Sequence, residues 1–156
     1  MAPVNARFLR GQGGQSIVEL ALALPIMAFS LIGGADLARG YAVLLAVQNG
    51  ARAGAESTAL DVTPTSTEAI ARVRDELGRT PGLTPANATV TVSYTLADGV
   101  SVCTGAASTA VAGTSSIATP CYANARVQYT FSTLIPWPLL PRDYTFDRTT
   151  RVRRYA

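Results

Sequence analysis

The chain has 156 residues, enough for one membrane helix and one small folded domain. Its basic residues are 13 arginines with no lysine, set against 10 acidic residues, and it contains no histidine. Without histidine, neither a Ser-His-Asp nor a Cys-His catalytic arrangement can be built, so we expect no enzyme. Five arginines fall in the last 15 residues. We interpret them as a solvated last strand. A nucleic-acid partner would need a soluble, broadly basic face, whereas an apolar run near the N-terminus predicts a membrane anchor with an exported domain.

An apolar run begins shortly after the N-terminus. Residues 1–14 are basic and glycine-rich, and we interpret them as a cytoplasmic leader. Residues 17–35 contain one charge, Glu19, and would form ~28 Å of helix, close to the ~30 Å hydrocarbon core of a bilayer. Arg7 and Arg10 precede this run, so the positive-inside rule keeps the leader in the cytoplasm and exports the chain beyond the run.

The helical pattern continues beyond the apolar run. Pro25 lies within the run and is expected to kink the helix. Further along, one residue in every four is small, a pattern that lets a second helix approach closely and that we assign to subunit assembly: Ala42, Ala46, Gly50 and Gly54. We expect one helix over about residues 17–56, hydrophobic all round at first and amphipathic later. The alternative is a membrane anchor followed by a separate amphipathic helix.

The remainder predicts one short helix and about three strands. Thr65 and Glu68 have the spacing of a capping box, and the apolar stripe after them predicts a helix over residues 68–77, which Gly78 would stop. Alternating apolar and polar residues predict strands, joined as an antiparallel sheet, over residues 89–96, 125–131 and 144–153.

Cys103 and Cys121 are the two cysteines, and both lie on the predicted exported side, where disulfides persist. A bond between them is the leading interpretation, and it would tether a long loop over residues 97–119. Two unpaired buried thiols are the alternative. A zinc site is disfavoured because the chain lacks histidine and a C-x-x-C pair, and we expect neither a metal nor a cofactor.

Trp137 stands between prolines in the segment P-W-P-L-L-P. It could cover the end of the sheet, or it could be an apolar knob that docks on a neighbouring subunit or lies at the membrane interface, where tryptophan is favoured.

These elements predict an α+β fold in three parts. Residues 1–14 form the leader, residues 15–56 the transmembrane and assembly helix, and residues 57–156 an exported α+β domain.

The N-terminal third carries a family resemblance. Gly14-Gln15-Ser16-Ile17-Val18-Glu19 matches the processing site of type IV prepilin-like proteins. The run R-G-Q-G-G-Q-S-I-V-E-L-A-L-A-L-P, followed by G-G-A-D-L-A-R-G-Y and V-Q-N-G-A-R-A-G-A, resembles the TadE-like family of the tight-adherence (Tad) pilus system. The resemblance covers about residues 10–55.

The resemblance implies a minor pilin or pseudopilin in the bacterial inner membrane, with its C-terminal domain periplasmic or extracellular. A prepilin peptidase would cut after Gly14 and make Gln15 the new N-terminus. Implied partners are this peptidase, TadF-like minor pilins, the major pilin, the inner-membrane assembly platform and membrane lipid. The exported domain is much larger than the nearly bare helix of a major Tad pilin, which argues against the main filament subunit.

The position of Glu19 near the membrane boundary favours pairing with an opposite charge. An ionised carboxylate near the membrane boundary is costly unless it is paired, and the freed amine of an adjacent subunit would suit it. Alternatively, Glu19 lies in the interfacial zone, stabilised by the helix N-terminus alone.

A second class of function fits the same apolar run. It could be the core of a secretory signal or signal anchor that delivers a small β-rich binding domain to the envelope. Cleavage would then fall near residues 33–35 and leave a mature chain beginning near Asp36.

Overall fold

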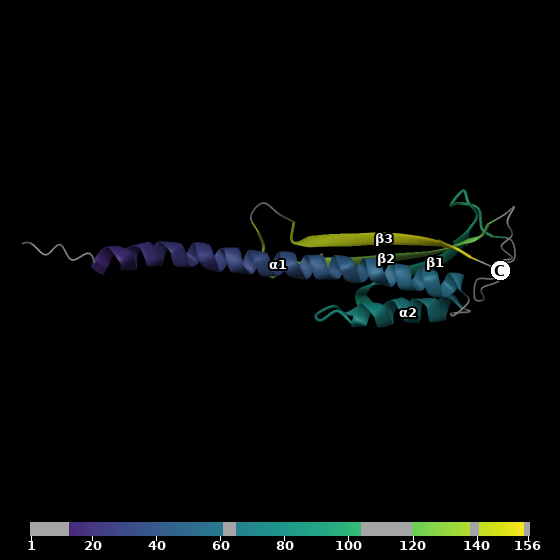
Figure 1. Cartoon of the computed structure of the whole chain (residues 1–156), viewed down its shortest axis with the longest axis horizontal. Coiled ribbons are helices and arrows are strands. Elements are labelled where there is room, and N and C mark those ends of the chain that lie inside the picture. Colours follow the sequence, from purple (N-terminus) through teal and green to yellow (C-terminus); the bar gives the residue numbers. More distant parts are fainter. Residues whose placement is uncertain (1–12, 61–64, 104–119, 138–140, 155–156) are drawn as a thin grey trace, which may run out of the picture. The chain divides into compact units, whose positions relative to one another are not determined.

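A computed structural model describes residues 13–60, 65–103, 120–137 and 141–154. The chain divides into two compact units, Met1–Leu37 and Ala38–Ala156. The fold is α+β, as predicted (Figure 1). Its elements are helix α1 (Gly13–Ala59), helix α2 (Ser66–Gly78), the 3-10 turn η1 (Pro85–Asn87) and strands β1 (Thr89–Thr95), β2 (Tyr122–Ser132) and β3 (Asp143–Arg153).

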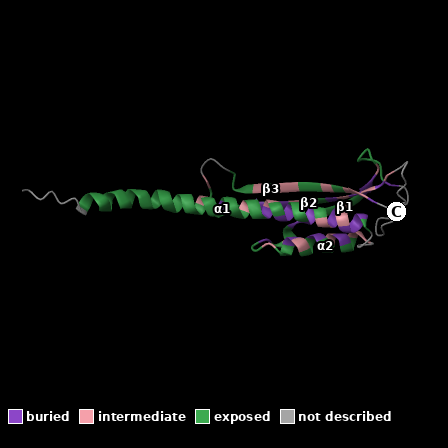
Figure 2. Cartoon of the chain, viewed as in Figure 1, coloured by how far each residue is buried: buried purple, intermediate pink, exposed green. Residues whose placement is uncertain are grey.

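Helix α1 is a single continuous helix, which rules out the alternative of two separate helices. Residues 14–32 are exposed on every side, whereas buried positions recur along the second half of the helix (Figure 2). Pro25 lies inside the helix, within the exposed stretch. Near its C-terminal end, the buried hydroxyl of Thr58 donates to the Gly54 carbonyl at 2.7 Å, so this polar side chain is satisfied within the helix.

Helix α2 begins with the predicted capping box. The Thr65 hydroxyl accepts from the Glu68 backbone N–H at 3.2 Å, and the Glu68 carboxylate accepts from the Thr65 N–H at 3.1 Å. Two otherwise unpaired backbone donors are thereby satisfied. The apolar stripe of the helix is fully buried through Ala69, Val73 and Leu77.

The three strands form an antiparallel sheet in the order β1-β2-β3, confirming the predicted pairing. Alternate residues of the central strand β2 are buried on one face: Ala123, Ala125, Val127, Tyr129 and Phe131. The expected alternation holds in β1 up to Tyr94, because Val90, Val92 and Tyr94 are more buried than Thr91 and Ser93 between them. Thr95, expected on the polar face, is as buried as Tyr94.

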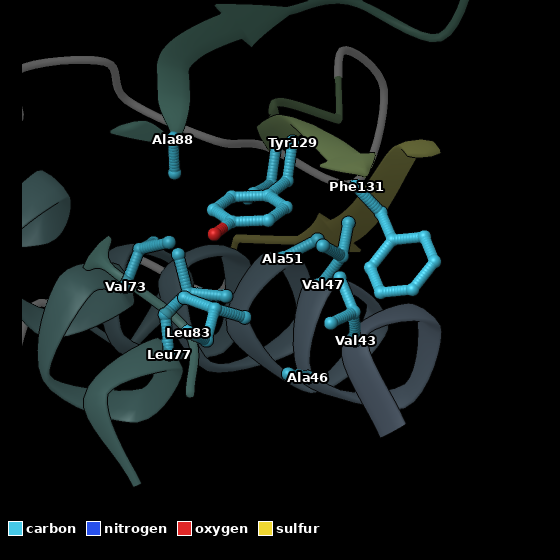
Figure 3. Packing of buried hydrophobic residues seen from close by; sticks show 11 residues of the cluster. Val43, Ala46, Val47, Ala51, Val73, Leu77, Leu83, Ala88, Tyr129 and Phe131 are labelled. Carbon is cyan, nitrogen blue, oxygen red and sulfur yellow. The ribbon is translucent and has the colours of Figure 1, made fainter. Parts of the chain in front are cut away.

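The core of the Ala38–Ala156 unit lies between the second half of α1, helix α2 and the buried face of β2 (Figure 3). Gly40 of α1 lies against the Phe131 ring, and Gly54 lies against Ala125. From Gly40 to Gly54 the helix rises ~21 Å, and from Phe131 to Ala125 the strand spans ~20 Å. Helix and strand are therefore nearly aligned and run in opposite directions.

A second cluster closes the other end of the sheet. The predicted disulfide joins Cys103 to Cys121, with the two Cα atoms 5.9 Å apart. Both cysteines are buried with Ala59 and Tyr94. Of the predicted loop over residues 97–119, residues 104–119 lie outside the described part of the chain.

The second half of α1 belongs to the folded unit. The unit begins at Ala38, earlier in the chain than the domain start expected at residue 57. The physical reason is that Val47, Ala51 and Ala55 are fully buried in the unit and supply one wall of its core.

Candidate processing and assembly site

Gly14 and Gln15 lie in the first turn of α1. An added Cβ at Gly14 would meet no atom within 4 Å, and both residues are exposed. The peptide bond between them is therefore not covered by any described part of the chain.

Glu19 lies on the same side of the helix as Gln15, one turn further along. The Gln15 side-chain amide donates to the Glu19 carboxylate at 3.3 Å. Within the described residues, the donor to the Glu19 carboxylate is therefore an uncharged amide. The first turn of α1 contains no acidic residue, and Glu19 lies beyond it, where the helix dipole acts weakly. A charged partner for Glu19 would have to come from outside the described residues.

The helix around Glu19 presents an apolar surface. It is long and apolar enough to cross a membrane, by its length and by a mean hydropathy of 2.0. Its exposed large apolar side chains in this stretch are Ile17, Val18, Leu20, Leu22, Leu24, Ile26, Met27, Phe29, Leu31 and Ile32. The Ser30 hydroxyl donates to the Ile26 carbonyl at 2.8 Å, so it adds no unsatisfied polar group.

The small-residue row packs within the chain. A Cβ at Gly50 would lie 3.3 Å from Leu77, and one at Gly54 would lie 2.4 Å from Val73, both on α2. Ala46 is also buried in this core, whereas Ala42 is exposed. The close helix approach that the row permits is therefore made by α2 of the same chain. Ala46, Gly50 and Gly54 are therefore buried within the chain, and the expected subunit-assembly role of the row stays a prediction.

Of the five C-terminal arginines, Arg142, Arg148 and Arg151 are exposed, as expected of a solvated strand, whereas Arg153 is half-buried. The Arg151 guanidinium lies 4.0 Å from the Tyr122 ring centroid and donates to the Ala97 carbonyl at 3.2 Å. Arg154 is buried at 8% exposure. Arg151 holds the end of the sheet to the turn after β1, a role that sequence could not reveal because its partners are distant along the chain.

An ion pair on the outer face of the sheet links strands β2 and β3. Arg126 donates to both carboxylate oxygens of Asp147, with its Nε at 3.0 and 3.1 Å. Hydrogen bonding from Arg126 lowers the pKa of Asp147, and Gln128 adds a further donor. In the part of the chain that the structure describes, no three His, Cys, Asp or Glu side chains gather into a possible metal site.

One pocket was not foreseen from sequence. It has a volume of about 290 Å³ and lies between α1, the segment after α2 and β2. The Arg39 guanidinium stands 5.3 Å from the Phe131 ring centroid at its wall. No local pattern marks Arg39, because its aromatic partner lies on a distant strand.

One stretch of α1 contains the exposed Gly14–Gln15 bond, the glutamate one turn further along and the apolar helix surface. This stretch is similar to a known protein family. Residues 14–56 match the TadE-like protein family. This match confirms the resemblance seen in the sequence and supports a protein associated with the Tad pilus. No curated protein and no solved structure matches the chain. Residues 57–156, which include α2 and the whole sheet, lie outside the TadE-like segment.

The TadE-like segment spans both structural roles of α1. Its first part is the exposed apolar surface that could cross a membrane, and its second part is the wall of the core. Pilus components are the partners that the family suggests, and the apolar helix suggests a membrane anchor.

Proposed function

We propose that the protein is a minor pilin or pseudopilin of a Tad-type pilus, cleaved after Gly14 by a prepilin peptidase and acting in pilus assembly or initiation. The TadE-like match over residues 14–56 carries this proposal. Its role is structural rather than catalytic. The protein would cross the inner membrane once, with residues 1–14 in the cytoplasm and the sheet-containing domain exported.

The geometry of the first turn supports cleavage. Hydrolysis of the Gly14–Gln15 bond would release the leader and leave an ammonium group on Gln15. Both residues that flank the bond are exposed, and a side chain at Gly14 would point into open space, so no other described element covers the bond.

Cleavage would also give Glu19 a charged partner. Glu19 would become the fifth residue of the mature chain, with only the neutral amide of its own Gln15 as a described donor. A carboxylate beside an apolar helix surface is costly unless it is paired. The new ammonium group of a neighbouring pilin supplies the opposite charge, so Glu19 would set the register between subunits.

Subunit contacts would use exposed parts of α1. Because Ala46, Gly50 and Gly54 pack inside the chain, neighbouring helices would meet α1 on the side that carries Ala42 and along the exposed stretch at residues 14–32. TadF-like minor pilins, the major pilin and the inner-membrane assembly platform are the proposed partners.

The mature N-terminus tests cleavage. Mass spectrometry of the protein purified from membranes of a strain with the prepilin peptidase should find a chain beginning at Gln15, and a peptidase-deficient strain should retain residues 1–14. A chain beginning near Asp36 would instead support a signal-anchored envelope protein with a small β-rich binding domain.

The role of Glu19 requires a separate variant. Glu19→Ala should leave the fold intact but reduce co-purification with other pilins and reduce piliation, because the subunit ammonium group loses its partner. Glu56→Ala is the matched control, since Glu56 pairs with Arg52 on the same helix at the solvent surface. If Glu19→Ala and the control both leave association and piliation unchanged, the pairing proposal fails.

A further inference from the structure

The segment joining β2 to β3 exposes apolar side chains at one end of the sheet. The Thr133 N–H donates to the Arg142 carbonyl at 2.9 Å, and the Thr133 hydroxyl donates to the Ile135 carbonyl at 2.9 Å. These bonds fix the base of the segment, with Thr133 itself buried. Beyond it, Leu134 is 60% exposed, and Ile135 and Trp137 are half-buried.

Contacts within the Ala38–Ala156 unit place this segment at one particular end. Phe131, two residues before Thr133, lies against Gly40, whereas the start of β2 lies at the disulfide end. Because β2 runs antiparallel to α1, the chain leaving β2 continues in the direction of the N-terminal end of α1. The apolar segment therefore projects from the end of the domain at which α1 enters it.

The membrane span ends close to this point along the chain. Gly40 follows Ala35, the last residue of the apolar run, by five residues, or ~7.5 Å of helical rise. Leu134 follows Phe131 by three residues, a reach of ~10 Å for an extended chain. A bilayer that holds the apolar run would have its polar layer near Ala35, and only these short stretches of chain separate Ala35 and Leu134 from the contact between Gly40 and Phe131.

The chemistry of the segment suits that layer. Leucine and isoleucine supply apolar area, and tryptophan prefers the interface because its ring is apolar and its indole N–H is a donor. Arg39 and Arg142 are exposed at the same end and would face anionic headgroups, with the carboxylates of Asp143 and of Asp36, three residues before Arg39, as the opposing charges nearby.

We propose that residues 134–137, through Leu134, Ile135 and Trp137, lie in the headgroup layer of the membrane that α1 spans, as a second attachment that holds the exported domain at the bilayer surface. The attachment rests on the proposed membrane insertion of α1. Its consequence is that the domain would be oriented at the membrane by two points rather than by one helix.

Trp137 is the sole tryptophan, so the wild-type chain reports on its own position. The full chain would be reconstituted into vesicles of phosphatidylcholine and phosphatidylglycerol carrying a quencher either on the headgroup or deep in the acyl chains. We expect the headgroup label to remove most of the tryptophan emission, the deep label to remove little, and aqueous iodide to quench weakly.

A matched variant places the reporter at the opposite end of the domain. Val100 is 82% exposed in the turn after β1, beside the disulfide cluster. Trp137→Phe combined with Val100→Trp should give emission that both lipid labels leave unchanged and that iodide quenches strongly.

The outcomes separate this inference from the proposal on which it rests. If the chain floats with the vesicles but neither lipid label quenches Trp137, the interfacial attachment is refuted. If Trp137 becomes shielded only when other pilus subunits are present, the segment docks on a subunit and the attachment is again refuted. If the chain does not float with the vesicles, membrane anchoring by α1 is the proposal that fails.

Discussion

Gly54→Ala tests how closely α1 and α2 pack. The added methyl carbon would lie 2.4 Å from Val73 Cγ2 and 3.2 Å from Ala125 Cβ. Carbon atoms in contact prefer ~3.5–4.0 Å, so the first contact is short by more than ~1 Å. Val73 is fully buried and β-branched, so its χ1 is stiff and the side chain cannot swing away. Helix α2 would have to move.

Two opposing effects set the change in the free energy of unfolding caused by Gly54→Ala. Overpacking costs ~1–3 kcal/mol, and two short contacts to buried atoms place this site at the upper end. Replacing glycine by alanine inside a helix returns ~1 kcal/mol of helix propensity. The expected net loss is ~2 kcal/mol, which for a unit of this size lowers Tm by ~8 °C.

The assay is thermal unfolding of the purified full chain in detergent, followed by near-ultraviolet circular dichroism. Gly34→Ala is the matched control, because it adds the same methyl group to the same helix where nothing lies within 4 Å. A second test adds Val73→Ala to Gly54→Ala, and the pair should be less destabilising than the sum of the single changes by ~2 kcal/mol. A Gly54→Ala protein as stable as wild type, or more stable, would refute the close approach of α1 and α2.

Three further predictions concern the Ala38–Ala156 unit. Replacing Cys103 and Cys121 by serine should lower the free energy of unfolding by ~3 kcal/mol, measured by urea denaturation against the oxidised wild type, because the unfolded chain loses its cross-link. Thr65→Ala removes the capping box of α2 and should cost ~1 kcal/mol in the same assay, whereas Thr65→Ser should cost little. The Arg126 hydrogen bond lowers the pKa of Asp147 below its usual ~3.9, so its stabilisation is present above about pH 4 and is lost as the pH falls through the lowered folded-state pKa. Urea midpoints between about pH 2 and pH 6 should therefore depend less steeply on pH in Asp147→Asn, and an unchanged slope would contradict this assignment.

Patterns confined to a few neighbouring residues were predictable from sequence. The capping box depends on two residues three apart, and the strands depend on alternation with a period of two, so both are local properties. The disulfide was predictable because the chain has only two cysteines and was expected to be exported. The TadE-like segment was recognisable because its motifs are contiguous.

Only the tertiary structure decided the packing partner of each face. A glycine or alanine at every fourth position indicates that another element packs closely against α1, but the spacing does not identify that element. Here the neighbour of Gly50 and Gly54 is α2 of the same chain. The same limit applies to Arg39 and Arg151, whose aromatic partners are brought to them by strands remote in sequence.

The sequence by itself determined the local chemistry of this protein: a glycine before the apolar run, a glutamate near the start of the run, an apolar helix, a capped helix and three alternating strands. The tertiary structure decided that the second half of α1 is a wall of the domain core and that the segment after β2 projects from the end at which α1 enters the domain. The physical reason is that helix and strand periods fix which side chains share a face, whereas the direction in which two elements pack depends on contacts between residues far apart along the chain.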